Sequence, residues 1–126
     1  MQTIKNIWIN GCFDILHRGH LEMFKFAKGF KGTVIVGIDS DSRVKELKGE
    51  TRPVNNQEDR KFFLECIKYV DKVVIFKNEV QLEDFILSYD PDIMIVGSDY
   101  KNKPVIGSQY AKKLVFFDRI GGYSTT

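Results

Sequence analysis

Two histidines stand three residues apart, shortly after the end of an apolar run near the amino terminus. His17 and His20 share this stretch with Gly11 and Gly19. A glycine lets the backbone approach a ligand closely, and the first N–H groups of a helix carry a partial positive charge. Histidine adds side-chain donors that can become cationic near a phosphate. The combination predicts a phosphate-binding site between a strand and a helix.

Two other interpretations of the histidines stay open at this point. Each alone is compatible with a capping residue in a turn, and the pair could form half of a metal site. The only nearby carboxylates are Asp14 and Glu22, and the chain has no third histidine. We therefore predict no metal held by protein ligands. Neither GxxxxGK[ST] nor GxGxxG occurs, which disfavours P-loop kinases and nicotinamide dehydrogenases.

The composition limits the kind of molecule that can carry such a site. The chain has 126 residues, a net charge of +2 and 43% hydrophobic residues. This length predicts one domain over residues 1–126, a near-minimal core without a regulatory or second catalytic domain. The balanced charge predicts no nucleic-acid partner, and no apolar run has the length of a membrane span. No secretory signal is visible, and Cys12 and Cys66 fit no disulfide or metal pattern, so we expect a cytoplasmic protein.

Apolar runs rich in β-branched residues alternate with segments of helical spacing. The runs predict buried parallel strands, and the alternation predicts a Rossmann-like, doubly wound α/β sheet of about five strands. The predicted strands are residues 4–9, 33–38, 73–76, 93–96 and 114–117. The predicted helices are residues 19–28, with Leu21, Phe24 and Ala27 inward; 58–70, with Phe62, Phe63, Cys66, Ile67 and Val70 inward; and 80–89, with Leu82, Phe85 and Ile86 inward.

Two loops are expected to complete the site. Residues 45–57 contain Gly49, Pro53 and two adjacent asparagines, which predicts a mobile flap carrying Lys45 and Lys48. Residues 98–108 form the second irregular segment. In this fold class ligands bind outside the carboxyl ends of the strands, so both loops should reach one crevice.

The motif GCFDILHRGH at residues 11–20 resembles the GxFDxxHxGH signature of the cytidylyltransferase-like nucleotidyltransferases, a branch of the HxGH superfamily. Residues 119–126 resemble the RTxGxSTT segment of the same family. Residues 60–73 resemble its central helix and the strand that follows. These similarities cover nearly the whole chain and occur at both of its ends.

Two subfamilies compete within this resemblance. Arg119 and the run from Arg60 are similar to glycerol-3-phosphate cytidylyltransferase, although Leu82 stands where that subfamily has an acceptor-binding Lys. Residues 47–55 and 97–108 are more similar to the domain that adenylylates heptose 1-phosphate. The first expectation is transfer of CMP from CTP to glycerol 3-phosphate or a related polyol phosphate, with pyrophosphate released. Transfer from ATP to a heptose-like sugar 1-phosphate is the alternative, and a catalytically silent nucleotide sensor is the second alternative.

The resemblance also implies roles for individual residues. Transfer would proceed by direct in-line displacement, with Mg²⁺ carried by the nucleotide and few protein ligands to it. Relatives are commonly dimeric, so a homodimer is a further expectation. Asp14 has two open roles, to orient the first loop or to face the acceptor, and Asp99 could approach the base or cap a turn. The implied catalytic residues are His17, His20, Lys45, Lys48 and Arg119; the nucleotide-binding residues are Gly11, Cys12, Phe13, His17, Arg18, Gly19, His20, Lys48, Asp99, Arg119, Ile120, Gly121, Gly122, Tyr123, Ser124, Thr125 and Thr126; the acceptor-binding residues are Asp14, Lys45 and Arg60.

Overall fold

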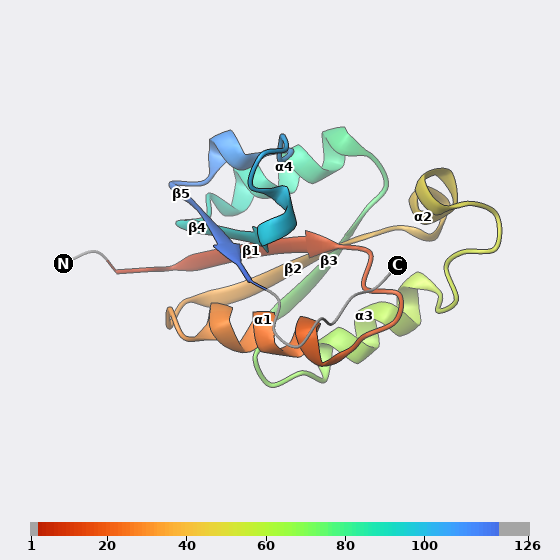
Figure 1. Cartoon of the computed structure of the whole chain (residues 1–126), viewed down its shortest axis with the longest axis horizontal. Helices are drawn as coiled ribbons and strands as arrows, with labels where there is room; N and C mark the ends of the chain where they lie inside the picture. Colours follow the sequence, from red (N-terminus) through yellow and green to blue (C-terminus); the bar gives the residue numbers. More distant parts are fainter. Residues whose placement is uncertain (1–2, 119–126) are drawn as a thin grey trace.

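A five-stranded parallel sheet runs through the middle of the molecule (Figure 1). The computed structural model describes residues 3–118. The strand order is β3-β2-β1-β4-β5, so the order reverses direction between β1 and β4, and the predicted Rossmann-like fold is confirmed. The strands are β1 (Asn6–Gly11), β2 (Thr33–Asp39), β3 (Lys72–Phe76), β4 (Ile93–Gly97) and β5 (Lys113–Phe117).

Helices cover both faces of this sheet. Helices α1 (Arg18–Lys28) and α3 (Gln57–Glu65) lie on one face, and α4 (Glu79–Tyr89) lies on the other (Figure 1). Helix α2 (Asp41–Lys48) follows β2 directly and projects beyond the carboxyl ends of the strands. Short 3₁₀ turns at Ser98–Tyr100 and Ser108–Tyr110 interrupt the connection from β4 to β5.

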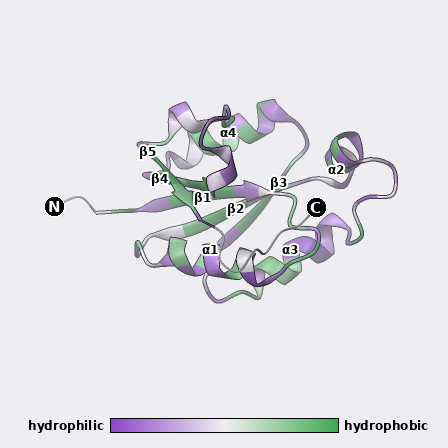
Figure 2. Cartoon of the chain, viewed as in Figure 1, coloured by the Kyte–Doolittle hydropathy of each residue, from purple (hydrophilic) through white to green (hydrophobic). Residues whose placement is uncertain are grey.

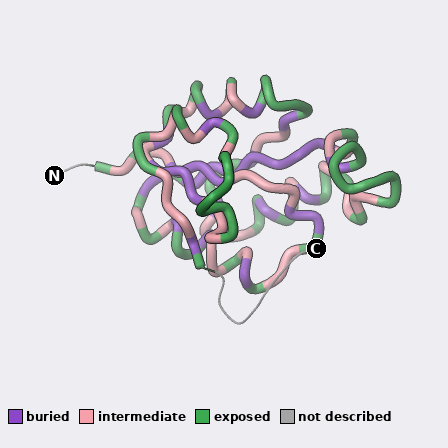
Figure 3. Tube along the Cα trace, turned by 45° about the horizontal axis from the view of Figure 1, so that its top comes forward, coloured by how far each residue is buried: buried purple, intermediate pink, exposed green. Residues whose placement is uncertain are grey.

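Alternation along the strands produces two apolar cores. In β1, Ile7 and Ile9 pack toward α1 and α3, whereas Trp8 between them packs toward α4. The strands are largely hydrophobic and buried, and the outer turns of the helices are exposed (Figures 2 and 3). Gly37 on β2 makes room for the indole, because a Cβ there would lie 2.5 Å from the Trp8 ring. The strand next to the site thus holds a large side chain without displacing the sheet.

Helix α2 is missing from the sequence-based prediction, which placed Lys45 and Lys48 on a loop. The structure puts both lysines in the last turn of a helix that begins after Ser40 and ends at Gly49. Ser40 accepts a hydrogen bond from the Arg43 N–H, a standard amino-terminal cap. Only Val44 of this helix is buried, so its hydrophobic periodicity is too weak to find from the sequence.

The helix predicted at residues 58–70 corresponds to α3, which ends at Glu65, and its predicted inward face is wrong in part. Phe62 and Phe63 are 62% and 44% exposed, and Cys66 lies just beyond the helix end, also exposed. The buried positions of α3 are instead Arg60 and Leu64, four residues apart on one face. A charged residue therefore occupies the inward position where the pattern predicted apolar ones. On α1, Phe24 and Ala27 are buried as predicted, but Leu21 is 39% exposed.

Candidate functional site

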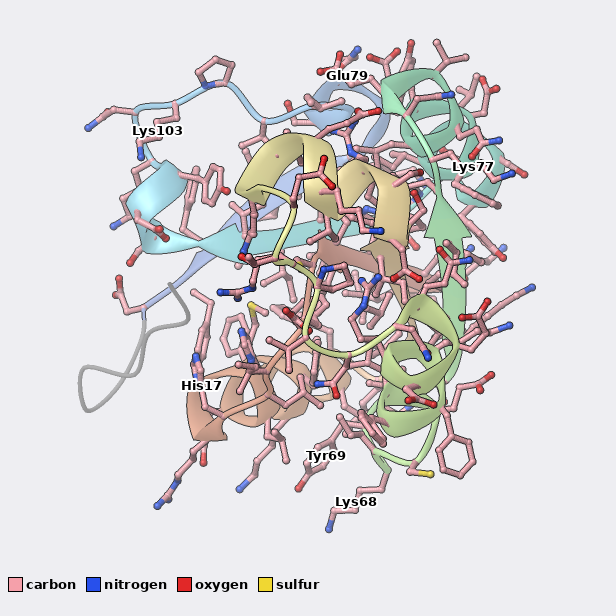
Figure 4. The ribbon with its side chains drawn as sticks, turned by 90° about the vertical axis from the view of Figure 1, so that its right-hand side faces the viewer. His17, Lys68, Tyr69, Lys77, Glu79 and Lys103 are labelled. Atoms are coloured by element: carbon pink, nitrogen blue, oxygen red, sulfur yellow. The ribbon has the colours of Figure 1, made fainter. Side chains whose placement is uncertain are left out.

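A cavity of about 710 Å³ opens at the carboxyl ends of β1, β2 and β4. Figure 4 looks onto this edge of the sheet, with His17 at the start of α1 and α2 crossing above it. The residues after β1, the end of β2 and the turn after β4 all contribute to the wall, as the strand order requires. Of the predicted site residues, the cavity wall includes Gly11, Cys12, Phe13, Asp14, His17, Gly19, His20, Lys48 and Asp99.

The two histidine rings are stacked, with centroids 4.0 Å apart. His17 is the amino-terminal cap of α1: its Nδ1 accepts the Gly19 N–H at 3.0 Å. His20 Nδ1 accepts the His17 N–H at 3.3 Å, so each ring caps backbone at the same turn. A neutral imidazole that accepts at Nδ1 carries its proton at Nε2. Both rings are therefore held as Nε2–H donors beside the positive end of a helix.

Phe13 takes an unusual backbone conformation between the first strand and these histidines. Its φ is +49°, in the left-handed region that non-glycine residues rarely adopt. The Phe13 and His20 rings meet edge to face with their centroids 5.1 Å apart, and a Cβ at Gly11 would lie 3.1 Å from the Phe13 ring. Gly11 therefore leaves space for the ring that supports His20. Burial raises the pKa of the neighbouring Cys12 thiol, which disfavours a nucleophilic role for it.

Two arginines on the cavity wall were not predicted from the sequence. Arg43, on α2, donates from Nε to Asp39 Oδ1 at 2.7 Å and lies over the Phe76 ring. Arg52 donates from Nε to Asp14 Oδ2 at 3.2 Å. Together with Lys48, they place cationic groups on the wall formed by α2 and the segment after it. The four-residue spacing of Asp39 and Arg43 was the available signal, but Asp39 ends β2 and Arg43 lies in α2, so the pair is recognised only once the junction between these elements is known.

Asp14 fastens the segment that carries Arg52 to the loop after β1. Its carboxylate accepts the backbone N–H groups of Val54 and Asn55, both at 2.8 Å, besides the Arg52 guanidinium. Burial alone would raise the pKa of Asp14, but these hydrogen bonds outweigh it and lower the pKa below its ordinary value. Of the two roles open from the sequence, the contacts support orientation of the loop. The expected flap is thus attached to the site wall at residues 52–55.

Three other predicted residues lie away from the cavity. Arg60 is fully buried, and its guanidinium binds protein groups, which does not support direct contact with an acceptor. Lys45 borders a smaller concavity of about 290 Å³ between α2 and α3. The Arg18 side chain is 71% exposed and paired with Glu22 on the outside of α1. Residues 119–126, including Arg119, lie outside the described part of the chain.

Within residues 3–118, no three His, Cys, Asp or Glu side chains are grouped so as to hold a metal ion. In the same range, no helix combines the length and apolar character needed to cross a lipid bilayer.

Comparison with known proteins finds relatives that match this chain over almost its entire length. The bifunctional protein HldE of Campylobacter fetus is 44% identical over 95% of this chain, and that of Nitratiruptor sp. is 46% identical over the same share. The HldE of Helicobacter pylori strain P12 is 43% identical over 97%. In each case the match spans 26% of the relative, so this chain corresponds to about a quarter of those proteins.

The fold also matches a solved structure. The lipopolysaccharide core biosynthesis protein from Thermoplasma volcanium superposes with a TM-score of 0.74, covering 92% of this chain and 98% of that one. The sequence identity is 24%, so this likeness concerns the fold alone. Residues 8–119 match the family described as cytidylyltransferase-like, a span that contains the strand-to-helix motif, both histidines and the cavity wall. The chain belongs to the cytidylyltransferase-like family of nucleotidyltransferases.

Proposed function

We propose that this chain transfers an adenylyl group from ATP to the phosphate of a heptose-like sugar 1-phosphate. The observation that carries the proposal is the 43–46% identity to HldE proteins over 95% or more of the chain. The segment 47–55, which resembles the heptose 1-phosphate adenylyltransferase domain, supports it because Leu47, Lys48 and Arg52 border the cavity. The sequence-based preference for CTP and glycerol 3-phosphate is correspondingly weaker.

The proposed reaction needs no general base. An oxygen of the ionised sugar phosphate attacks the α-phosphorus of ATP, a new P–O bond forms, and the bond from the α-phosphorus to the bridging oxygen of the β-phosphate breaks. Pyrophosphate leaves and a nucleoside diphosphate sugar remains, with no proton required by either step. The difficulty is repulsion between two anions, so catalysis consists of alignment and charge neutralisation.

The cavity contains donors suited to this task. The Nε2–H groups of His17 and His20 and the amino end of α1 would stabilise charge that develops on the triphosphate. Arg43, Lys48 and Arg52 would neutralise the acceptor phosphate from the wall opposite α1. Mg²⁺ would enter with the triphosphate as part of the substrate.

A second candidate is CMP transfer from CTP to a polyol phosphate. Leu82 bears on this candidate because the glycerol-phosphate subfamily has an acceptor-binding Lys at this position. Leu82 is 2% exposed and belongs to the apolar wall of the cavity. This position therefore supplies no cation for glycerol phosphate.

The experiment is pyrophosphate release measured with ATP, CTP, GTP and UTP, each against heptose 1-phosphate, a hexose 1-phosphate and glycerol 3-phosphate. We expect ATP with heptose 1-phosphate to give the highest kcat/KM. Preference for CTP with glycerol 3-phosphate would instead support the second candidate. Nucleotide binding without turnover in any combination would leave a nucleotide sensor, and the transferase proposal would be wrong.

The variant Arg52→Gln tests the acceptor wall, the part of the cavity wall that carries Arg43, Lys48 and Arg52. It removes the cation while keeping a polar side chain beside Asp14. We expect KM for the sugar phosphate to rise about tenfold or more, with less change in KM for ATP, because bidentate Arg–phosphate contacts are among the stronger polar interactions. Equal changes in both KM values would contradict the assignment of Arg52 to the acceptor.

A further inference from the structure

Arg60 is a fully buried arginine on the inner face of α3, directly behind the cavity wall. Its Nη1 donates to the carbonyl of Cys12 at 3.0 Å and to the carbonyl of Asp39 at 2.7 Å. Its Nε donates to the Asn55 carbonyl at 2.9 Å, and its Nη2 donates to Asp41 Oδ1 at 2.8 Å. One guanidinium thus joins the loop after β1, the end of β2, the start of α2 and the segment after α2.

The contact with Cys12 sets the direction of a peptide in the cavity wall. In a trans peptide the C=O and the following N–H point in opposite directions. The Cys12 carbonyl points at Arg60, which has no exposed surface, so the Phe13 N–H points away from α3. Cys12 and Phe13 both line the cavity, whereas Arg60 does not. The bond therefore fixes the direction of a backbone donor in a segment that lines the cavity.

The same peptide leads into Phe13, the residue with a strained backbone whose ring contacts His20. Phe13 has a φ of +49°, a conformation that persists only where the surroundings enforce it. Its ring meets the His20 imidazole edge to face. A rotation of the Cys12–Phe13 peptide would therefore also move His20. Arg60 lies two contacts away from this ring and does not need to touch the substrate to affect it.

A second route leads from Arg60 to the acceptor wall. The Asn55 carbonyl is held by Arg60, and the Asn55 side chain donates to the backbone carbonyl of Asp14 at 2.6 Å. Asp14 in turn binds the Arg52 guanidinium. Arg60 is thus connected to groups on both sides of the cavity, the histidine side and the arginine side.

We propose that Arg60 is a positioning residue that holds the Phe13 N–H and the His20 ring in the geometry required for nucleotidyl transfer. This inference rests on the proposed transfer reaction in the cavity. It assigns Arg60 a role other than the acceptor contact implied by the family resemblance, because the guanidinium is fully enclosed by protein groups.

The experiment compares Arg60→Met, Arg60→Lys and Leu64→Ala in the full chain. Leu64 is equally buried on the same face of α3 but lies outside the cavity wall, so Leu64→Ala controls for lost stability. Turnover, KM for each substrate and the melting temperature are measured well below the melting temperature of every variant. Chemical shifts of the Phe13 amide and the His20 ring nitrogens are recorded without ligands, which makes them independent of whether ATP is the correct substrate.

For Arg60→Met we expect kcat to fall by about tenfold to a hundredfold, the size of effect that small misplacements of reacting groups produce. The Phe13 and His20 signals should shift away from their wild-type positions. Arg60→Lys should lie between wild type and Arg60→Met. Leu64→Ala should lower the melting temperature while kcat and both sets of signals stay close to wild type.

A folded Arg60→Met variant with wild-type Phe13 and His20 signals would overturn the proposal, as would a loss of kcat in Leu64→Ala equal to that in Arg60→Met. If Arg60→Met does not fold, the same criteria apply to Arg60→Lys. If the wild type turns over no substrate pair, the proposed function fails, while the ligand-free shifts of Arg60→Met and Arg60→Lys still decide whether Arg60 positions Phe13 and His20.

Discussion

At the scale of single residues, each histidine of the cavity wall has an observed capping contact and, in the proposed reaction, a second task as a donor. Nδ1 of His17 caps α1 by accepting the Gly19 N–H, and the neutral ring then carries its proton on Nε2. His20 follows the same arrangement with the His17 N–H. A substitution can therefore remove one task and keep the other, which allows the catalytic role to be tested without disturbing the helix.

His17→Asn keeps an acceptor near the position of Nδ1 but removes the Nε2 donor. Because Asn is a favourable amino-terminal cap, the melting temperature should stay near that of wild type, whereas His17→Ala should cost about 1 kcal/mol of stability. Both variants should lower kcat by about 10²- to 10³-fold, the effect of removing one preorganised donor. Pyrophosphate release and ATP binding check this, and an equal loss of kcat and of nucleotide affinity would contradict a transition-state role.

Asp14→Asn should destabilise the chain at neutral pH by about 2 kcal/mol, because the carboxylate accepts hydrogen bonds that are partly charge-assisted. The folded-state pKa of Asp14 lies below its ordinary value, so its contribution is complete above that ordinary value and is lost as pH falls through the lowered pKa. Urea unfolding at pH 7 and pH 3 measures this. The difference between wild type and variant should be smaller at pH 3. Asp84→Asn, on the exposed side of α4, should change little at either pH.

At the scale of elements, the orientation of α2 determines which of its cationic side chains border the cavity. Arg43 and Lys48 border the cavity, and Lys45 on the same helix faces a separate concavity. The helix ends at Gly49, whose φ of +105° and ψ of 169° are essentially restricted to glycine. The position of Lys48 thus depends on a backbone conformation one residue further on.

Gly49→Ala tests this dependence. No atom lies within 4 Å of a Cβ at this position, so the substitution introduces only backbone strain, on the order of 1–3 kcal/mol. We expect the end of α2 to unwind and so relieve this strain. Lys48 should then be displaced, and KM for at least one substrate should rise several-fold while the fold persists. Steady-state kinetics and circular dichroism check this. Glu50→Ala, at the exposed neighbouring residue, should leave KM unchanged, and identical kinetics for both variants would show that the cap does not position Lys48.

At the scale of the whole molecule, the two ends of the sheet serve different purposes. The carboxyl ends of the strands form the cavity. At the amino ends, Asp71 accepts the Val34 N–H and the Lys28 ammonium group. Asp92 likewise accepts the N–H groups of Lys5 and Asn6. Both aspartates precede a strand and bind the start of the neighbouring strand, which joins β3 to β2 and β4 to β1.

Asp71→Asn combined with Asp92→Asn should make stability less dependent on pH in the acid range. Burial would raise the pKa of Asp71, but hydrogen bonds from Lys28 and Val34 outweigh burial and lower this pKa. The pKa of Asp92 is also lowered, mainly by the hydrogen bond from the Lys5 N–H. Both carboxylates therefore stabilise the fold above their ordinary pKa and lose this effect as pH falls through the lowered one. The fall in melting temperature between pH 6 and pH 3 should be smaller in the double variant.

Because both aspartates lie far from the cavity end of the sheet, the double variant should keep wild-type kcat and KM at pH 7 at temperatures where it is folded. A large change in kcat would show that the two ends of the sheet are energetically coupled. An unchanged or steeper loss of stability in acid would contradict the assignment of these carboxylates as acid-sensitive anchors.

The sequence by itself determined the sheet, the strand-to-helix motif and the family resemblance, which the family match then confirmed. These features are local: apolar runs rich in β-branched residues predict buried strands, and His17, Gly19 and His20 lie within one helical turn, so their proximity follows from spacing alone. The buried faces of α1 and α4 were largely predicted because apolar residues dominate them.

Only the tertiary structure decided the contacts of Arg52, Asp14 and Arg60. Asp14 binds groups around residue 54, and Arg60 binds a carbonyl at residue 12, so these contacts join segments about 40 or more positions apart. No local pattern carries this information, because the partners are backbone groups that every residue possesses. Arg60 is charged and yet fully buried, since carbonyls and a carboxylate of the folded chain satisfy its guanidinium, an environment that does not exist until the loops have met.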